Sequence, residues 1–165
     1  MGTVHIVFGQ LGAGKSTYAR ELADSISGLR FSIDEWMADM YCPDTPAPLR
    51  LDWVMDRVQR CERRIWAVAS EAARRGIAVV LDFGFIKASS RSAFRTLAER
   101  EGLAVQMHFV TAPMEVRRQR VMARNHERGA TFSFEVTPAM FDYMENEFEA
   151  PSEKELAVCT VKQTA

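Results

Sequence analysis

Residues 9–17, with the sequence GQLGAGKST, restrict the fold more than any other part of the chain. The P-loop pattern G-x-x-x-x-G-K-[ST] is met by Gly9, Gly14, Lys15 and Ser16. In that pattern the glycines let consecutive backbone N–H groups turn inward and hold phosphate oxygens. A β-branched, apolar run precedes the loop at 3–8, and an amphipathic helical pattern follows it to residue 26. The loop therefore joins a strand to a helix N-terminus, which favours an anion. A tight turn alone would explain the glycines but not the adjacent lysine and serine.

Strand-like and helix-like segments alternate along the whole chain. The expected strands are 3–8, 29–33, 77–81, 104–110 and 155–161. The expected helices are 15–26, 49–75, 89–101, 113–127 and 138–147. This alternation predicts an α/β fold with a mainly parallel sheet covered on both faces. The segments CPDTPAP at 42–48 and NHERGATFSFEV at 125–136 have the composition of loops, and Thr137 with Pro138 makes a good helix start.

Composition limits the class of protein. The 165 residues are 47% hydrophobic, which suits one compact domain over 1–165. A net charge of −1 argues against a general nucleic-acid or membrane-surface binder. The absence of a membrane-length apolar stretch or a cleavable signal predicts a cytoplasmic protein. The three cysteines show no C-x-x-C spacing, so we expect reduced thiols rather than a zinc site or a disulfide framework.

Two acids follow expected strands, where ligands of open α/β sheets gather. Asp34 comes after the second strand in RFSIDEW, and Asp82 ends the third in AVVLDFGF. Asp34 precedes the helix-like EWMADM and could instead be an ordinary helix cap. Asp82 is followed by the poor helix formers FGF, so a magnesium–phosphate role suits it better.

Arginines line one face of the helix expected at 113–127. They are Arg117, Arg120, Arg124 and Arg128, at i, i+3, i+7 and i+11. Such a row can be a solvated, salt-bridged face. Here the nearby acids are too few to balance it, and the helix leads into an irregular loop. Arginines on a moving segment can stabilise the charge of a transferring phosphoryl group.

The long helix expected at 49–75 carries a core-facing apolar stripe with a second line of residues beside it. That second line is Trp53, Arg57, Arg60 and Arg64. It is either a charged flank whose arginine stems cover apolar surface, or the border of an acceptor site. In the second case the donors suit a small hydroxylated acceptor with an anionic or strongly polar group, and the indole offers a stacking face.

Together these residues resemble the P-loop small-molecule kinases, which include shikimate and gluconate kinases, chloramphenicol phosphotransferase, zeta-toxin and polynucleotide 5′-kinase groups and nucleoside-monophosphate kinases. The chain is most similar to bacterial ATP-binding proteins described as predicted kinases, through its P-loop, the acid after the second strand, the V-V-L-D third strand and the R-x-x-x-R-N segment. The resemblance implies a three-layer P-loop NTPase fold of kinase type, with sheet order 2-3-1-4-5 and a lid at about 125–136. It also implies that Arg120 covers adenine, Arg124 binds phosphates and Asp34 accepts the substrate's proton.

The resulting prediction is a Mg²⁺- and ATP-dependent phosphotransferase acting on a small-molecule hydroxyl. The expected nucleotide-binding residues are Gly9, Gly12, Ala13, Gly14, Lys15, Ser16, Thr17 and Arg120. Ser16 and Asp82 are expected at the metal, although Asp34 is an alternative metal-linked acid, and Lys15, Asp34 and Arg124 are expected to be catalytic. Asp34, Trp53, Arg57 and Arg60 are expected at the acceptor. A polynucleotide 5′-hydroxyl kinase and an ATP-hydrolysing switch remain alternatives, although the N-K-x-D and D-x-x-G segments of guanine-nucleotide switches are absent. The identity of the acceptor and the oligomeric state stay open.

Overall fold

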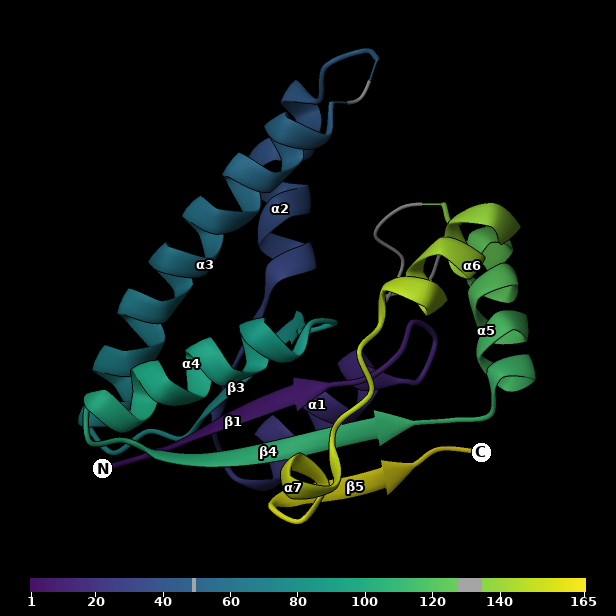
Figure 1. Ribbon diagram of the computed structural model, residues 1–165. Helices are drawn as coiled ribbons and strands as arrows, with labels where there is room; N and C mark the ends of the chain where they lie inside the picture. Colours follow the sequence, from purple (N-terminus) through teal and green to yellow (C-terminus); the bar gives the residue numbers. More distant parts are fainter. Residues whose placement is uncertain (49, 128–134) are drawn as a thin grey trace.

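The computed structural model describes residues 1–48, 50–127 and 135–165, and its centre is a five-stranded sheet (Figure 1). The strands are β1 (Thr3–Phe8), β2 (Leu29–Ser32), β3 (Val79–Gly84), β4 (Ala104–Thr111) and β5 (Cys159–Gln163). They lie in the order β2-β3-β1-β4-β5, and every neighbouring pair is parallel. This confirms the predicted α/β fold and the order 2-3-1-4-5. All five strands therefore present their carboxyl ends at one edge of the sheet.

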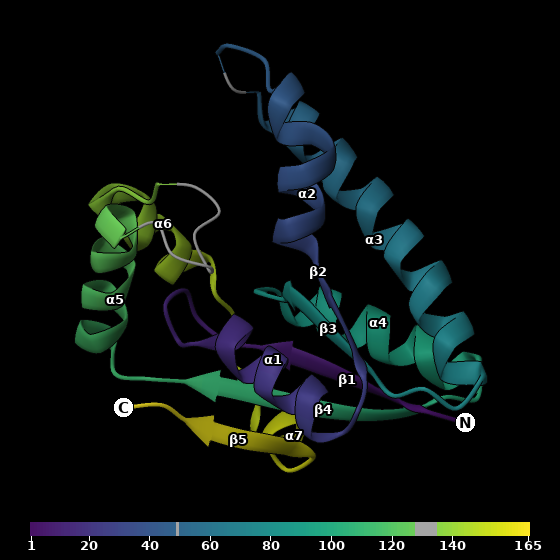
Figure 2. The ribbon, with the colours of Figure 1, turned by 180° about the vertical axis from the view of Figure 1, so that it is seen from behind.

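Helices surround the sheet. They are α1 (Lys15–Ser25), α2 (Ile33–Tyr41), α3 (Leu51–Arg74), α4 (Ala88–Arg100), α5 (Met114–Glu127), α6 (Pro138–Glu147) and α7 (Glu153–Leu156), with a short 3-10 helix at Cys42–Asp44. The alternating side chains of β1 enter two different clusters: Val4, Ile6 and Phe8 pack with α3 and α4, whereas Val7 packs with α1. Figures 1 and 2 show these helices on opposite faces. The predicted cover on both faces is thus confirmed.

Helices α2 and α3 form an arm that rises away from the sheet (Figures 1 and 2). The second half of α3 is anchored in the core through residues such as Cys61, Ile65 and Ala69. The first half carries exposed Leu51 and Met55 and packs mainly against α2. The 42–48 segment lies at the far end of the arm, so its prolines mark the turn between the two helices.

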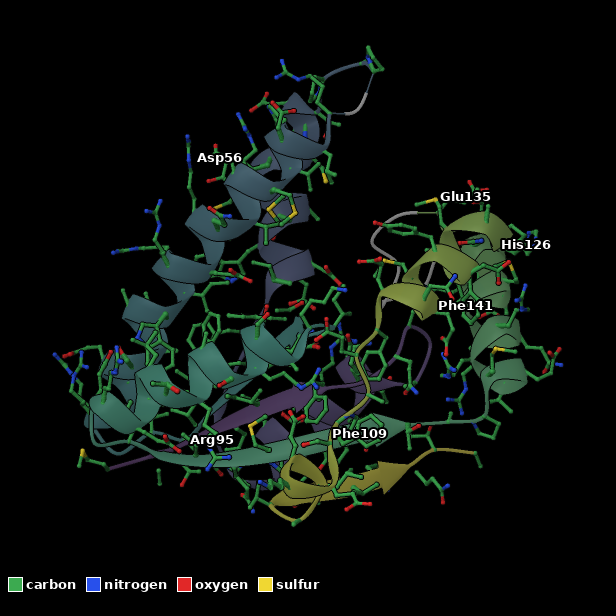
Figure 3. All side chains as sticks on the ribbon, viewed as in Figure 1. Asp56, Arg95, Phe109, His126, Glu135 and Phe141 are labelled. Atoms are coloured by element: carbon green, nitrogen blue, oxygen red, sulfur yellow. The ribbon has the colours of Figure 1, made fainter. Side chains whose placement is uncertain are left out.

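Helices α5 and α6 stand together beyond the carboxyl end of β4 (Figure 1). Thr137 caps α6 by accepting from the Met140 backbone N–H, and Pro138 is its first residue, as predicted. Figure 3 labels Phe141 on α6 beside α5; its side chain is fully buried and packs in a cluster with Val121 and Val136. This pair of helices is fixed to the strand ends, where ligands of such sheets bind.

The last strand differs from its prediction. Residues 155–156 of the expected strand 155–161 lie in helix α7, which Ser152 caps by accepting from the Glu155 backbone N–H. β5 then begins at Cys159 and extends two residues further than expected. None of the described helices is long and apolar enough to cross a membrane.

Candidate active site

A cleft of about 900 Å³ opens at the carboxyl ends of the strands. Its lining includes Asp34, Asp82, Arg120, Arg124 and most of the P-loop: Gly12 and residues 14–18, but not Gly9 or Ala13. These residues come from four separate parts of the chain, and the parallel sheet brings them to one edge. The cleft is near the upper end of the volume range of small-molecule sites.

The P-loop has the backbone that its glycines allow. Gly12 and Gly14 have φ values of 78° and 88°, a left-handed conformation that disfavours other residues. At Gly9 a Cβ atom would lie 1.9 Å from the Val110 carbonyl oxygen, so no side chain fits there. Gly14 is the N-cap of α1. The first backbone N–H groups of a helix have no partner within the helix, so they can bind an anion at this end.

Lys15 is the first residue of α1, and its Nζ donates to the Gln10 carbonyl oxygen at 2.9 Å across the loop. Burial lowers the pKa of Lys15, while the nearby carboxylates of Asp82 and Asp34 act to raise it. The ammonium group therefore lies close enough to Asp82 and Asp34, the two acids predicted to follow strands, for their charges to act on it. A bound polyphosphate would stabilise the charged form of Lys15 in the same way.

Asp34 lies in the first turn of α2, but it is not the cap of this helix. Ser32 is the N-cap and accepts from the Glu35 backbone N–H. The cap alternative for Asp34 is therefore wrong, and its carboxylate lines the cleft instead. Enclosure in the cleft raises the pKa of Asp34, and repulsion from Asp82 adds to this, whereas Lys15 and Arg124 act to lower it. A carboxylate with a raised pKa is a better proton acceptor than an ordinary one.

Asp82 is buried at the end of β3, in register with Val7 of β1 and Ser32 of β2. Its Oδ2 atom is 3.6 Å from Nε of Arg30 and has no hydrogen-bond partner. A buried carboxylate oxygen without a donor fits a hydrated cation, and the Ser16 hydroxyl lines the same cleft. Within residues 1–48, 50–127 and 135–165 no cluster of three or more His, Cys, Asp or Glu side chains could hold a metal. Mg²⁺ at a P-loop does not need one, since phosphates and water supply most of its ligands.

The arginines of α5 divide into different environments. Arg117 is buried, forms an ion pair with Glu145 of α6 at 2.5 Å, and donates to the Ala112 and Leu11 carbonyl oxygens. It holds α5 and α6 against the P-loop and does not line the cleft. Arg124 does line the cleft, where burial lowers its pKa and the charge of Asp34 opposes this effect. Arg128 lies outside the described residues.

Arg120 also lines the cleft, and it is tied to the end of the chain. Its Nη1 donates to Oγ1 of Thr164 at 2.8 Å, and its Nη2 donates to the Ala165 carbonyl oxygen. Thr164 in turn donates to the Ala13 carbonyl oxygen of the P-loop at 2.9 Å. Because the Thr164–Ala13 bond joins residues 151 positions apart, sequence spacing gave no signal for the role of Thr164. Lys162 and Gln163, the last residues of β5, and Thr164 also line the cleft.

Asn125 closes the base of the expected lid. Its side-chain amide donates to the Val136 carbonyl oxygen at 2.8 Å and accepts from the Val136 backbone N–H at 3.0 Å. The two ends of the expected lid, 125–136, are thus joined by one side chain. Residues 128–134 of that lid lie outside the described part of the chain.

The cleft does not include the expected acceptor residues Trp53, Arg57 and Arg60. They lie on the arm, on the same outer half of α3 as Asp56, which Figure 3 labels far from the strand ends. The Arg57 guanidinium lies 3.8 Å from the Trp53 ring centroid and donates to the Trp53 carbonyl oxygen, and Arg60 pairs with Asp56. The charged-flank interpretation accounts for these contacts, and an acceptor role for these residues stays a prediction.

Comparisons with known proteins agree with this architecture. A family model described as an AAA domain matches residues 4–151. The chain is similar to the structure of a candidate kinase from Chloroflexus aurantiacus J-10-fl, at 14% identity and a TM-score of 0.77, with 98% of this chain and 88% of that chain covered. It is also similar to a sugar kinase from Janibacter sp. HTCC2649, at 16% identity and a TM-score of 0.63, with 99% and 86% covered.

A further similar structure is Chaetomium thermophilum Kti12 in complex with ADP-AlF3, at 18% identity and a TM-score of 0.64, with 98% of this chain and 88% of that chain covered. No curated protein matches the sequence. At these identities the likeness to solved structures shows the fold, which is that of the P-loop kinases.

Proposed function

The chain belongs to the AAA domain family, whose model spans residues 4–151, and we propose that it is an ATP-dependent phosphotransferase that moves the γ-phosphate to the hydroxyl of a small molecule. The observation that carries this proposal is the meeting of Lys15, Asp34 and Arg124 in one cleft. A carboxylate in the same cleft as the phosphate loop suits removal of the proton from an acceptor hydroxyl, which phosphate transfer requires.

The P-loop supplies the nucleotide site. Backbone N–H groups from Gly9 to Thr17 surround the phosphates, and Lys15 neutralises charge on the β- and γ-phosphates. Arg120, which donates to Oγ1 of Thr164, would cover the adenine base. The fold of Kti12, whose structure contains ADP-AlF3, supports a nucleotide in this position.

Ser16 and Asp82 would hold Mg²⁺, the serine through its hydroxyl and the aspartate through its unpartnered Oδ2. When bound, the ion neutralises charge on the phosphate oxygens and orients them. Arg30 Nε is 3.6 Å from Oδ2 of Asp82, so its charge attracts the carboxylate without a hydrogen bond to that oxygen.

Asp34 acts as the general base. Its carboxylate accepts the proton of the acceptor hydroxyl while the acceptor oxygen forms a bond to the γ-phosphorus and the bond from that phosphorus to the bridging oxygen of ADP breaks. Arg124 lines the same cleft as Asp34, and we assign it to stabilising the charge on the transferred group.

Phosphate transfer can be measured directly. ³¹P NMR of ATP with the protein, Mg²⁺ and a panel of alcohols, sugars, nucleosides and 5′-hydroxyl oligonucleotides should show a new phosphomonoester from a small-molecule alcohol. Lys15→Ala should abolish its formation and weaken ATP binding, because a cation leaves a polyphosphate site. Inorganic phosphate alone, with no ester from any acceptor, would support a hydrolytic switch. Esters formed only on oligonucleotides would support a polynucleotide kinase.

A further inference from the structure

Strand order divides the cleft into two halves around the P-loop. Because β1 is central, the residues that follow β4 and β5 lie on one side of the loop, and those that follow β2 and β3 lie on the other. Arg120 and Lys162 belong to the first half, whereas Asp34 and Asp82 belong to the second. The proposed base Asp34 therefore marks the second half as the place of the acceptor.

The charges of the acceptor half are mostly negative. Among the described residues, the cations that line the whole cleft are Lys15, Arg120, Arg124 and Lys162. Lys15 belongs to the phosphate loop, and Arg120 with Lys162 to the other half. Arg124 follows β4 but is attracted to Asp34, and Arg30, which does not line the cleft, is 3.6 Å from Asp82. An anionic acceptor would bring a further negative charge to two carboxylates that already repel each other.

The remaining surface beside Asp34 and Asp82 is apolar. It includes Met144 of α6, which follows β4 in the sequence but lies five residues before Glu149, the residue bonded to Ile86 on the β3 side. Phe83, Ile86 and Met144 are partly exposed and line the cleft. Phe83 stacks on buried Phe85 with 5.3 Å between ring centroids and meets Phe94 edge-to-face at 5.4 Å. These rings form a packed aromatic layer whose outer members reach the cleft, next to the carboxylate that would receive the proton.

The backbone of this wall departs from a regular strand. Register with β1 shifts between Val7, opposite Asp82, and Phe8, opposite Gly84, so Phe83 is an extra residue in β3. Gly84 and Phe85 follow with φ values of 82° and 47°, and the second is an unfavourable conformation for a bulky side chain. Bulges and strained residues of this kind concentrate next to functional sites.

A buried ion pair holds the strained segment in place. Arg91 is almost fully buried, donates to the Phe85 carbonyl oxygen at 3.1 Å, and pairs with Glu155 at 2.5 Å. The Glu149 backbone N–H donates to the Ile86 carbonyl oxygen at 2.9 Å and so ties the chain that follows Met144 to the same wall. The wall is therefore fixed before any ligand binds, and rigid apolar surfaces bind at low entropic cost.

We propose that Phe83, Ile86 and Met144 form the binding surface for the acceptor, and that the acceptor is an uncharged alcohol with an apolar or aromatic body. This inference rests on the proposed phosphotransferase function, because it names the substrate class of the same cleft. The apolar body covers the wall while its hydroxyl reaches Asp34, which takes the proton as the oxygen attacks the γ-phosphorus and ADP leaves.

The test compares kcat/KM for 3-phenylpropan-1-ol with kcat/KM for gluconate, at saturating ATP and Mg²⁺. The wild-type protein should prefer the aryl alcohol by tenfold or more. Ile86→Thr and, separately, Phe83→Ala should each reduce this ratio about tenfold while leaving the ATP dissociation constant unchanged, because an apolar contact is lost from the acceptor side alone. Ile77→Thr is the matched control: Ile77 is 40% exposed, lies outside the cleft, and should not change the ratio.

Two outcomes would overturn the inference and leave the proposed function standing. One is preferred phosphorylation of gluconate or another acid-bearing acceptor, and the other is an unchanged ratio in Ile86→Thr with ATP binding intact. The substitution at Ile86 keeps the Phe83–Phe85–Phe94 packing, so it remains informative if Phe83→Ala does not fold. If ATP binds but neither alcohol class nor an oligonucleotide receives phosphate, the proposed function itself fails and the inference fails with it.

Discussion

Asp34 is the residue on which transfer, as opposed to nucleotide binding, depends. Asp34→Asn removes the proton acceptor but keeps the size of the side chain, so kcat should fall by about 10²–10⁴-fold. ATP binding measured by calorimetry should remain. Asp39→Asn, on the same helix but outside the cleft, is the matched control and should leave kcat unchanged. Loss of ATP binding in folded Asp34→Asn would instead make Asp34 the metal-linked acid.

The pH profile gives a second readout of the same residue. A general base must be ionised to act, so activity falls on the acid side as pH drops through its pKa. Enclosure raises the pKa of Asp34, and this moves the acid limb of the kcat profile above the position of an ordinary aspartate. The limb should disappear from the residual activity of Asp34→Asn.

Arg120 and Arg124 lie one turn apart on α5, but their surroundings differ. Arg120 is held by Thr164 on the side of β5, whereas Arg124 feels the charge of Asp34. Arg120→Ala should therefore raise KM for ATP, and Arg124→Ala should chiefly lower kcat. Arg118→Ala is the control from the same helix, since Arg118 pairs with Asp142 outside the cleft. Equal changes of both constants in both variants would contradict the assigned roles.

At the scale of elements, the arm of α2 and α3 depends on a small aromatic cluster. The Arg57 guanidinium lies 3.8 Å from the Trp53 ring centroid and 5.8 Å from that of Tyr41, and the two rings meet edge-to-face. Arg57→Ala should speed amide hydrogen exchange in α2 and in the first half of α3, because contacts across the arm are lost. Arg60→Ala, which removes a surface pair with Asp56, should change exchange little.

This pair of variants also tests the sequence-based prediction for the arm. If Arg57 and Arg60 bound the acceptor, both substitutions would raise its KM, with exchange faster only in Arg57→Ala. If Arg57 only stabilises the arm, Arg57→Ala speeds amide exchange without the parallel rise in KM of both variants, and Arg60→Ala leaves KM unchanged. Steady-state kinetics with the preferred alcohol therefore decide between the two interpretations.

The elements that sequence predicted well are those fixed by local chemistry. The P-loop between β1 and α1, the Thr137–Pro138 start of α6 and the apolar run of β3 each contain their own structural cause. Residues 155–156 were misassigned because Ser152 caps a short helix, by accepting from the Glu155 backbone N–H, where a strand was expected.

The site was predictable only in part, for the same reason. Asp34 and Asp82 follow strands, and parallel pairing necessarily brings strand ends together. The burial of Arg117 depends on Glu145, which α6 supplies from 28 residues away. The aromatic wall depends on a one-residue bulge that appears only when β3 pairs with β1. Regular spacing along α5 could not separate an arginine that braces two helices from those that line the cleft.

At the scale of the whole molecule, two histidines lie inside the fold between the sheet and α1. Nδ1 of His5 on β1 is 2.9 Å from Nε2 of His108 on β4, and the Tyr18 hydroxyl of α1 is 2.8 Å from Nδ1 of His108. Both histidines are buried. Two charged imidazoles would place two N–H donors face to face at the His5–His108 contact, so the folded state cannot hold both as cations.

Burial, with a smaller effect of His5, lowers the pKa of His108 to about 4 in the folded protein, against an ordinary value of 6.5. Between these values the unfolded chain binds a proton that the folded chain does not, so stability falls as pH falls. From pH 7 to pH 5 this one group should lower the free energy of unfolding by about 2 kcal/mol. Urea titrations at the two pH values should show this difference, reduced in His108→Gln.

The informative quantity is the slope of the unfolding free energy against pH. The unfolding free energy itself is less informative, because His108→Gln also alters the bond to Tyr18. His126→Gln is the matched control, because His126 is exposed on α5 and should keep the wild-type slope. An unchanged slope in His108→Gln would mean that the buried pair accepts a proton without cost.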